Sequence, residues 1–125
     1  MRLQKLPAFT DAALRALADI TGEDTQSMID DVRRGSSELW CVDGHSYMVT
    51  CVDNASRELI VCCYAGRDII AIANVLYRIA RNQNLQAVRF FTKRPALARK
   101  LQRGFPLLKE YGRVYRCEVP PNVAQ

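Results

Sequence analysis

The sequence predicts one small domain of the α/β (α+β) class, with a mixed central sheet that contains an antiparallel meander and is flanked by about four helices. Apolar residues at helical spacing alternate along the chain with short runs rich in β-branched and aromatic residues. Asp43-Gly44 and Asn54-Ala55-Ser56-Arg57 join neighbouring strand-like runs with turn chemistry. The chain has 125 residues, of which 49% are hydrophobic, enough for one core. We expect a single domain over residues 1–120 and a flexible tail over 121–125.

The N-terminal part predicts a short strand followed by two helices. The strand falls within residues 1–6 and is ended by Pro7. Thr10 or Asp11 caps a first helix that runs to about Ile20, because its apolar residues have helical spacing. A second helix, capped by Asp24 or Thr25, ends before Gly35.

The centre of the chain predicts the meander and a long helix. Its three strands are Glu38–Asp43, Ser46–Asp53 and Glu58–Tyr64. The helix runs from about Asp68 to Asn82 and has a wide apolar face, which indicates packing against the sheet. A strand over Ala87–Thr92 follows.

The C-terminal part predicts one more helix and a closing strand. Pro95 opens a helix through about Arg103, and Gly104 ends it. The closing strand lies near Val114–Val119.

Cysteine usage and hydropathy exclude several classes of protein. The cysteines are odd in number, form no CxxC motif and lie in apolar runs, which favours reduced core thiols in a cytoplasmic protein. The chain has one histidine and no paired cysteines, so we expect no metal site. No apolar run has membrane-spanning length, and the N-terminus does not have the pattern of a signal peptide. The sequence therefore predicts no membrane partner.

Charge is distributed unevenly along the chain. Residues 1–60 hold six Lys or Arg against ten Asp or Glu, whereas residues 61–125 hold twelve against three. The basic half can attract cofactor phosphates, nucleic acid or an acidic partner, or it can simply be a solvated surface.

The order of elements resembles that of the GNAT acyl-CoA N-acyltransferases. Two local patterns agree: the loop Cys63-Tyr64-Ala65-Gly66-Arg67-Asp68 before the long helix, and Ala96-Leu97-Ala98 followed by Gly104-Phe105. The chain looks most like the small, divergent members encoded by bacteriophages.

The resemblance implies that acetyl-CoA or another acyl-CoA binds at this loop. Its pyrophosphate would bind the backbone at the helix N-terminus, where unpaired N–H groups and the helix dipole favour an anion. The thioester arm would lie between the strand ending at Tyr64 and the strand Ala87–Thr92, and N–H groups of the first strand would polarise its carbonyl. The implied cofactor-binding residues are Val61, Cys62, Cys63, Ala65, Gly66, Arg67, Asp68 and, toward the 3′-phosphate, Arg99.

The sequence also departs from the family pattern. The loop keeps one glycine, and Asp68 places a carboxylate where phosphate would bind, unless it serves as an ordinary helix cap. The tyrosine that protonates the departing thiolate in the family has no counterpart in Pro95–Arg103.

The candidate catalytic residue is Glu58, at the position where some GNAT enzymes place a base that deprotonates the amine through water. The alternative for Glu58 is a solvated strand end. Cys62 and Cys63 have no histidine partner, so we interpret both as core residues rather than nucleophiles.

The sequence leaves three functions open. The first is a small acyl-CoA-dependent N-acyltransferase, either active on an unknown amine or catalytically degenerate. The second is a non-catalytic GNAT-fold binding or structural protein of a phage, either a virion component or a host-factor inhibitor. The third is a nucleic-acid-binding module that uses the basic C-terminal half. The expected location is the cytoplasm, or the host cytoplasm or virion if a phage encodes the protein. Each of the three functions also allows a homodimer or another protein partner.

Overall fold

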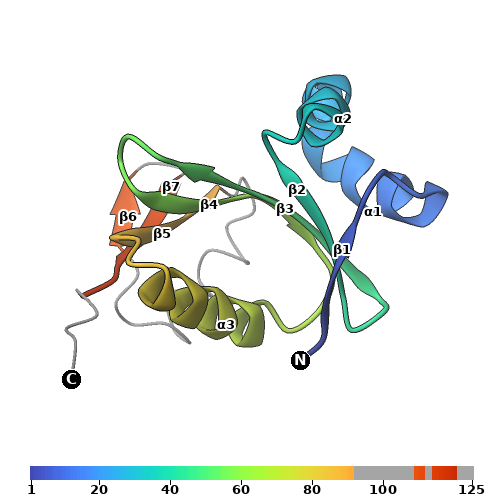
Figure 1. Cartoon of the computed structure of the whole chain (residues 1–125). Helices are drawn as coiled ribbons and strands as arrows, with labels where there is room; N and C mark the ends of the chain where they lie inside the picture. The colour runs from blue at the N-terminus through green and yellow to red at the C-terminus, as the bar shows by residue number, and fades with distance from the viewer. Residues whose placement is uncertain (92–108, 112–113, 121–125) are drawn as a thin grey trace. The chain divides into compact units, whose positions relative to one another are not determined.

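The computed structural model describes residues 1–91, 109–111 and 114–120 (Figure 1). In chain order its elements are β1 (Leu3–Leu6), α1 (Asp11–Thr21), a 3-10 turn (Gly22–Asp24), α2 (Thr25–Arg34), β2 (Glu38–Val42), β3 (Ser46–Asp53), β4 (Glu58–Ala65), α3 (Ile69–Asn82), β5 (Ala87–Phe91), β6 (Lys109–Tyr111) and β7 (Val114–Glu118).

Most predicted elements are confirmed with small shifts at their ends. The strand Ser46–Asp53 has the predicted bounds, the strand from Glu58 extends to Ala65, and the long helix begins at Ile69. Strand β6 was not predicted, because three residues are too few to show a period. The described residues contain three α-helices. The helix predicted over Pro95–Arg103 lies outside them, so the expected number of about four helices stays a prediction.

The strands form a mixed sheet in the order β1-β2-β3-β4-β5-β7-β6. The pairs β1–β2, β2–β3, β5–β7 and β6–β7 are antiparallel. Helix α3 connects β4 to β5, and a connection of that length is what parallel neighbours require.

The chain divides into two compact units. The first contains residues 1–51 and 61–67, and the second contains residues 52–60 and 68–125. The single domain expected over residues 1–120 stays a prediction.

The core of the first unit forms where α1 and α2 pack on strand residues. Thr10 caps α1 because its Oγ1 accepts a hydrogen bond of 3.1 Å from the N–H of Ala13. Gly35 ends α2 in the left-handed conformation, with φ of 80°. The buried core residues come from both helices and from β2, β3 and β4: Ala13, Leu17, Met28, Val32, Leu39, Val49 and Cys63.

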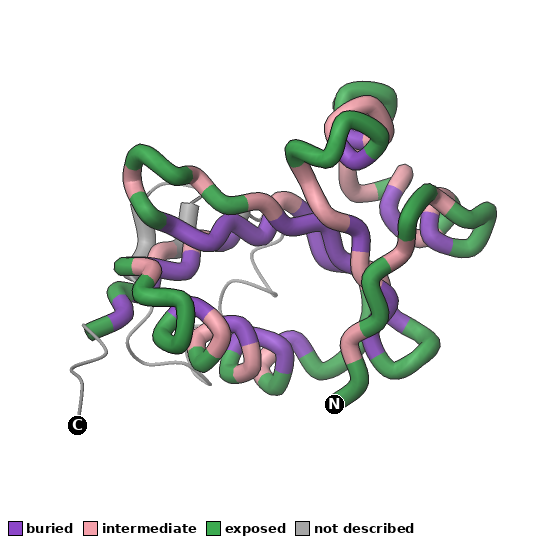
Figure 2. Tube along the Cα trace, viewed as in Figure 1, coloured by how far each residue is buried: buried purple, intermediate pink, exposed green. Residues whose placement is uncertain are grey.

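The core of the second unit lies along α3. The helix contacts β5, and Figure 2 shows buried segments recurring along it. Its buried residues stand at helical spacing: Ile69, Ile72, Ala73, Leu76 and Ala80. The entry to β5 is tied down by backbone bonds of Gln86, whose N–H donates to the carbonyl of Arg57 over 2.7 Å and whose carbonyl accepts from Val119 over 2.8 Å. This fixes the turn between β3 and β4 against the start of β5.

We predict that Leu17→Ala lowers the free energy of unfolding by about 2–5 kcal/mol, because Leu17 is fully buried in the first core and its removal leaves a cavity. Arg15→Ala, on the exposed face of the same helix, is the matched control and should change stability by less than about 0.5 kcal/mol. Urea unfolding of both variants measures the difference. Equal effects would contradict the core assignment.

Candidate functional site

The backbone between β4 and α3 passes so close to β3 that only glycine fits at position 66. Gly66 has φ of 149°, and a Cβ built on it would lie 1.9 Å from Oγ and 2.2 Å from Cβ of Ser46. It would also lie 2.9 Å from the Cα of Ser46, which is backbone and cannot rotate away. Gly66 is therefore required by a close approach as well as by its backbone conformation.

Side chains of the first unit hold the same loop on two sides. The N–H of Arg67 donates to Oγ of Ser46 over 3.0 Å, and the hydroxyl of Tyr64 donates to the carbonyl of Arg67. Ser46 is fully buried, and its Oγ also lies 2.6 Å from Nδ1 of His45. The Arg67 N–H, one of the predicted phosphate donors, is thus already bonded within the protein.

Helix α3 begins without a side-chain cap. Asp68, the N-cap residue, is in the left-handed region with φ of 58°, and its side chain makes no capping hydrogen bond. The first helical bond runs from the N–H of Ile72 to the carbonyl of Asp68 over 3.0 Å. The interpretation of Asp68 as an ordinary cap is therefore wrong, because its left-handed backbone replaces the extended geometry that a capping side chain needs. The first N–H groups of the helix receive no capping bond from it.

Of the predicted cofactor-binding residues of β4, Val61 and Cys63 are buried and Cys62 and Ala65 are partly buried. Burial raises the pKa of the Cys63 thiol to about 11. Burial and the neighbouring Cys51, whose Sγ lies 3.6 Å away, raise the pKa of Cys62 as well. A nucleophilic cysteine needs the opposite shift, so these positions fit the core interpretation of Cys62 and Cys63. The backbone role of Val61, Cys62 and Cys63 toward a cofactor stays a prediction.

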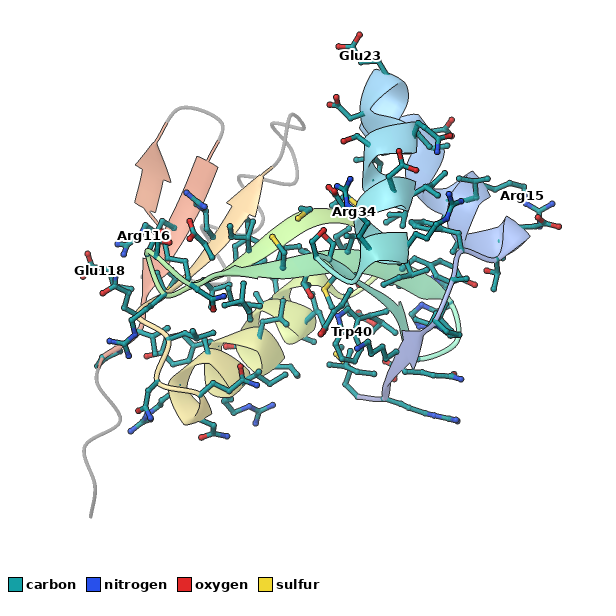
Figure 3. The ribbon with its side chains drawn as sticks, turned by 45° about the horizontal axis from the view of Figure 1, so that its top comes forward. Arg15, Glu23, Arg34, Trp40, Arg116 and Glu118 are labelled. Carbon is teal, nitrogen blue, oxygen red and sulfur yellow. The ribbon has the colours of Figure 1, made fainter. Side chains whose placement is uncertain are left out.

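Glu58, the candidate base, lies in the second unit and is paired. Its Oε2 accepts a bond of 2.8 Å from Nε of Arg116, while Nη1 of Arg116 reaches Oε1 of Glu118 over 3.1 Å. Figure 3 labels Arg116 and Glu118, which lie close together. Glu58 has 6% of its surface exposed, so the alternative of a solvated strand end is wrong.

The pairing sets the charge of Glu58. Burial acts to raise the pKa of Glu58, but the hydrogen bond from Arg116 and the positive charges of Arg89 and Arg116 outweigh burial and lower it. The carboxylate is therefore ionised at neutral pH and able to accept a proton. Its low proton affinity also makes it a weak base.

Sequence reasoning found part of this arrangement and missed the rest. It singled out Glu58, Gly66, Arg67 and Asp68, but not Ser46 or Arg116, whose contacts join residues far apart in the chain. Glu58 belongs to one unit and Gly66 and Arg67 to the other, so their assembly into one site stays a prediction. Arg99 lies outside the described residues.

Two absences hold for the part of the chain that the structure describes. Its His, Cys, Asp and Glu residues form no group of three or more that could hold a metal ion. None of its helices combines the length and apolar character needed to cross a membrane.

The solved structures that this chain resembles include acetyltransferases of the GNAT family. Tetrahymena GCN5 matches with a TM-score of 0.64 and 10% identity over 98% of this chain and 99% of that one. A Bacillus subtilis acetyltransferase in complex with CoA matches with a TM-score of 0.67 and 8% identity over 94% and 97%. The Escherichia coli GNAT family N-acetyltransferase YhbS, also in complex with CoA, matches with a TM-score of 0.60 and 9% identity over 94% and 81%.

The chain therefore has the GNAT fold, as its order of elements predicts. No protein-family model matches the sequence, and no curated protein matches it. At these identities the likeness concerns the fold, and the chemistry has to be argued from the residues of this chain.

We predict that Gly66→Ala destabilises the protein by at least about 2 kcal/mol, because it combines a strained backbone with a clash against Ser46. Gly44→Ala is the matched control: Gly44 also has a positive φ, of 76°, but a Cβ there meets nothing within 4 Å. It should cost only the conformational strain, about 1 kcal/mol. Thermal unfolding of the two variants tests the contact, and equal losses would refute it.

We also predict an acid-sensitive contribution of Glu58 to stability. The folded-state pKa of Glu58 lies below the ordinary value of 4.5, so the stabilisation is present above pH 4.5 and is lost as the pH falls through the folded-state pKa. Glu58→Gln should lower stability at pH 7 and flatten the slope of stability against pH below 4.5. Glu118→Gln, which changes the exposed partner of Arg116, is the control and should retain the slope. Chemical unfolding at several pH values measures both, and an unchanged slope in Glu58→Gln would contradict the pairing.

Proposed function

We propose that this protein binds an acyl-CoA at the loop between β4 and α3 and transfers its acyl group to an amine. The observation that carries the proposal is the loop itself: glycine is required at position 66, and the chain then enters a helix whose first N–H groups have no side-chain cap. The GNAT fold supports the assignment, since solved proteins with this fold have been crystallised with CoA.

The physical fit to a pyrophosphate has one favourable and one unfavourable part. Gly66, Arg67 and Asp68 are exposed, and a helix N-terminus with open N–H groups attracts an anion. The Arg67 side chain can add positive charge, although its N–H is bonded to Ser46. The Asp68 carboxylate repels phosphate, and this repulsion weakens the site compared with one that carries a neutral residue there.

The proposed reaction needs no acyl-enzyme. The amine nitrogen attacks the thioester carbonyl carbon, a C–N bond forms, the C–S bond breaks, and CoA leaves as its thiolate. The ammonium proton must pass to a base, and Glu58 is the candidate, acting through water. Its pairing with Arg116 makes it a weak base, and no tyrosine stands in Pro95–Arg103 to protonate the thiolate, so we expect slow transfer.

A second candidate is a GNAT-fold binding protein without catalysis. The same two features favour it: Glu58 is held in an ion pair, and the family tyrosine has no counterpart. A virion component or a host-factor inhibitor of a phage is the kind of protein that this alternative describes. The nucleic-acid-binding module also stays an alternative, supported by the basic C-terminal half of the sequence.

We predict that acetyl-CoA raises the melting temperature. A ligand at 100 times its Kd stabilises the folded state by about 2.7 kcal/mol. Pantetheine, which lacks the pyrophosphate, is the ligand control and should give a much smaller shift. Asp68→Asn should bind CoA more tightly, because it removes the repelling charge and retains a residue that tolerates a positive φ. No shift at millimolar acetyl-CoA would contradict the proposal.

A measurement of turnover distinguishes the acyltransferase from the non-catalytic binding protein. Release of free CoA thiol is followed with acetyl-CoA and a panel of primary amines, including polyamines and lysine peptides. Thiol release above the rate of hydrolysis, and its loss in Glu58→Gln, would support the transferase. Binding of acetyl-CoA without any amine-dependent release would support the non-catalytic alternative.

A further inference from the structure

Ser46 is a buried polar residue that the proposed chemistry does not use. It is the first residue of β3, directly after the Asp43-Gly44-His45 turn, and its side chain is fully buried. Its register partner is Val42 on β2, and the N–H of His45 donates to the carbonyl of Val42 over 3.2 Å. The hairpin therefore fixes the position of Ser46 by its own backbone bonds.

The hydroxyl of Ser46 is satisfied from two sides. Its Oγ accepts the N–H of Arg67 over 3.0 Å and lies 2.6 Å from Nδ1 of His45. The tautomer of His45 decides which of the two atoms donates in this contact, and in either tautomer a lone pair of Oγ stays available for the N–H of Arg67. One hydroxyl thus bonds the turn of the hairpin and the loop that follows β4.

Ser46 also defines the space at Gly66. The Oγ, Cβ and Cα atoms of Ser46 occupy the volume where any side chain at position 66 would lie. The loop therefore rests against Ser46 at Gly66 and is hydrogen-bonded to it at the next residue, Arg67. Two consecutive peptide units are held by a single side chain.

We infer that Ser46 is a positioning residue of the acyl-CoA site, which sets the path of the Gly66–Arg67 backbone so that the loop receives the cofactor phosphates in one conformation. The inference rests on the proposed function. Ser46 itself is buried and acts through the loop, so it contacts no cofactor atom. Because Ser46 accepts the hydrogen bond of the Arg67 N–H, this N–H already has an acceptor before any ligand binds.

The test compares two variants that each remove a buried hydroxyl from β3. Ser46→Ala removes the acceptor for Arg67. Thr50→Val removes the acceptor for Nε1 of Trp40, a bond of 3.0 Å elsewhere on the strand. Both should lower the melting temperature, whereas only Ser46→Ala should raise the Kd for CoA, because the Gly66–Arg67 backbone is then no longer held in one conformation before binding. Isothermal titration measures the Kd.

A second readout follows the loop without any ligand. Amide hydrogen exchange of Arg67, measured by NMR, should accelerate in Ser46→Ala and stay unchanged in Thr50→Val, because only the first variant frees that N–H. Ser46→Cys has a similar size and a weaker acceptor, so it should give intermediate values. It also supplies the comparison if Ser46→Ala does not fold.

The outcomes distinguish this inference from the proposed function. If the native protein binds CoA and the Ser46 variants bind it as tightly as Thr50→Val does, the inference is overturned and the proposed function stands. If the native protein binds no CoA, the proposed function fails and the role of Ser46 toward a cofactor fails with it. Unchanged Arg67 exchange in the Ser46 variants would overturn the contact itself.

Discussion

The contact between Ser46 and the backbone at Gly66 and Arg67 is the constraint on which the candidate site depends. A peptide backbone can approach another strand this closely only where a side chain is absent, and the N–H group that comes to face the strand needs an acceptor there. Both conditions are met by one glycine and one serine. The loop before α3 therefore has a defined conformation before any ligand binds, and preorganisation of this kind lowers the conformational cost of binding an anion.

The second unit places a different constraint on the chemistry. Glu58 is buried, and a buried carboxylate is tolerated because Arg116 and the nearby Arg89 compensate its charge. The same compensation holds the proton affinity of Glu58 low. A carboxylate that is held in an ion pair takes up a proton less readily, so Glu58 is a weaker candidate for the catalytic base. The geometry of the loop between β4 and α3 is therefore a stronger argument for acyl-CoA binding than the Glu58 carboxylate is for acyl transfer.

Much of the fold was predictable because its signals are local. Asp43-Gly44 marks the first hairpin, Thr10 and Gly35 mark helix ends, and the apolar spacing of α3 marks its buried face. The site was only partly predictable. Gly66 was identified as a phosphate-loop glycine, yet its contact with Ser46 lies 20 residues away in sequence. Glu58 looked like a solvated strand end because Arg116, its partner, stands 58 residues further on. Contacts over such separations leave no periodicity or turn motif to detect.

The close fit of Gly66 against Ser46 has a consequence for how this chain can diverge. A side chain can be acquired at position 66 only if the strand itself shifts, because the backbone Cα of Ser46 as well as its side chain lies in the volume that the new side chain needs. Substitutions at the two positions are therefore not independent, and each order of mutation passes through a different intermediate. Losing the serine first leaves an unbonded N–H, whereas gaining the side chain first produces a clash.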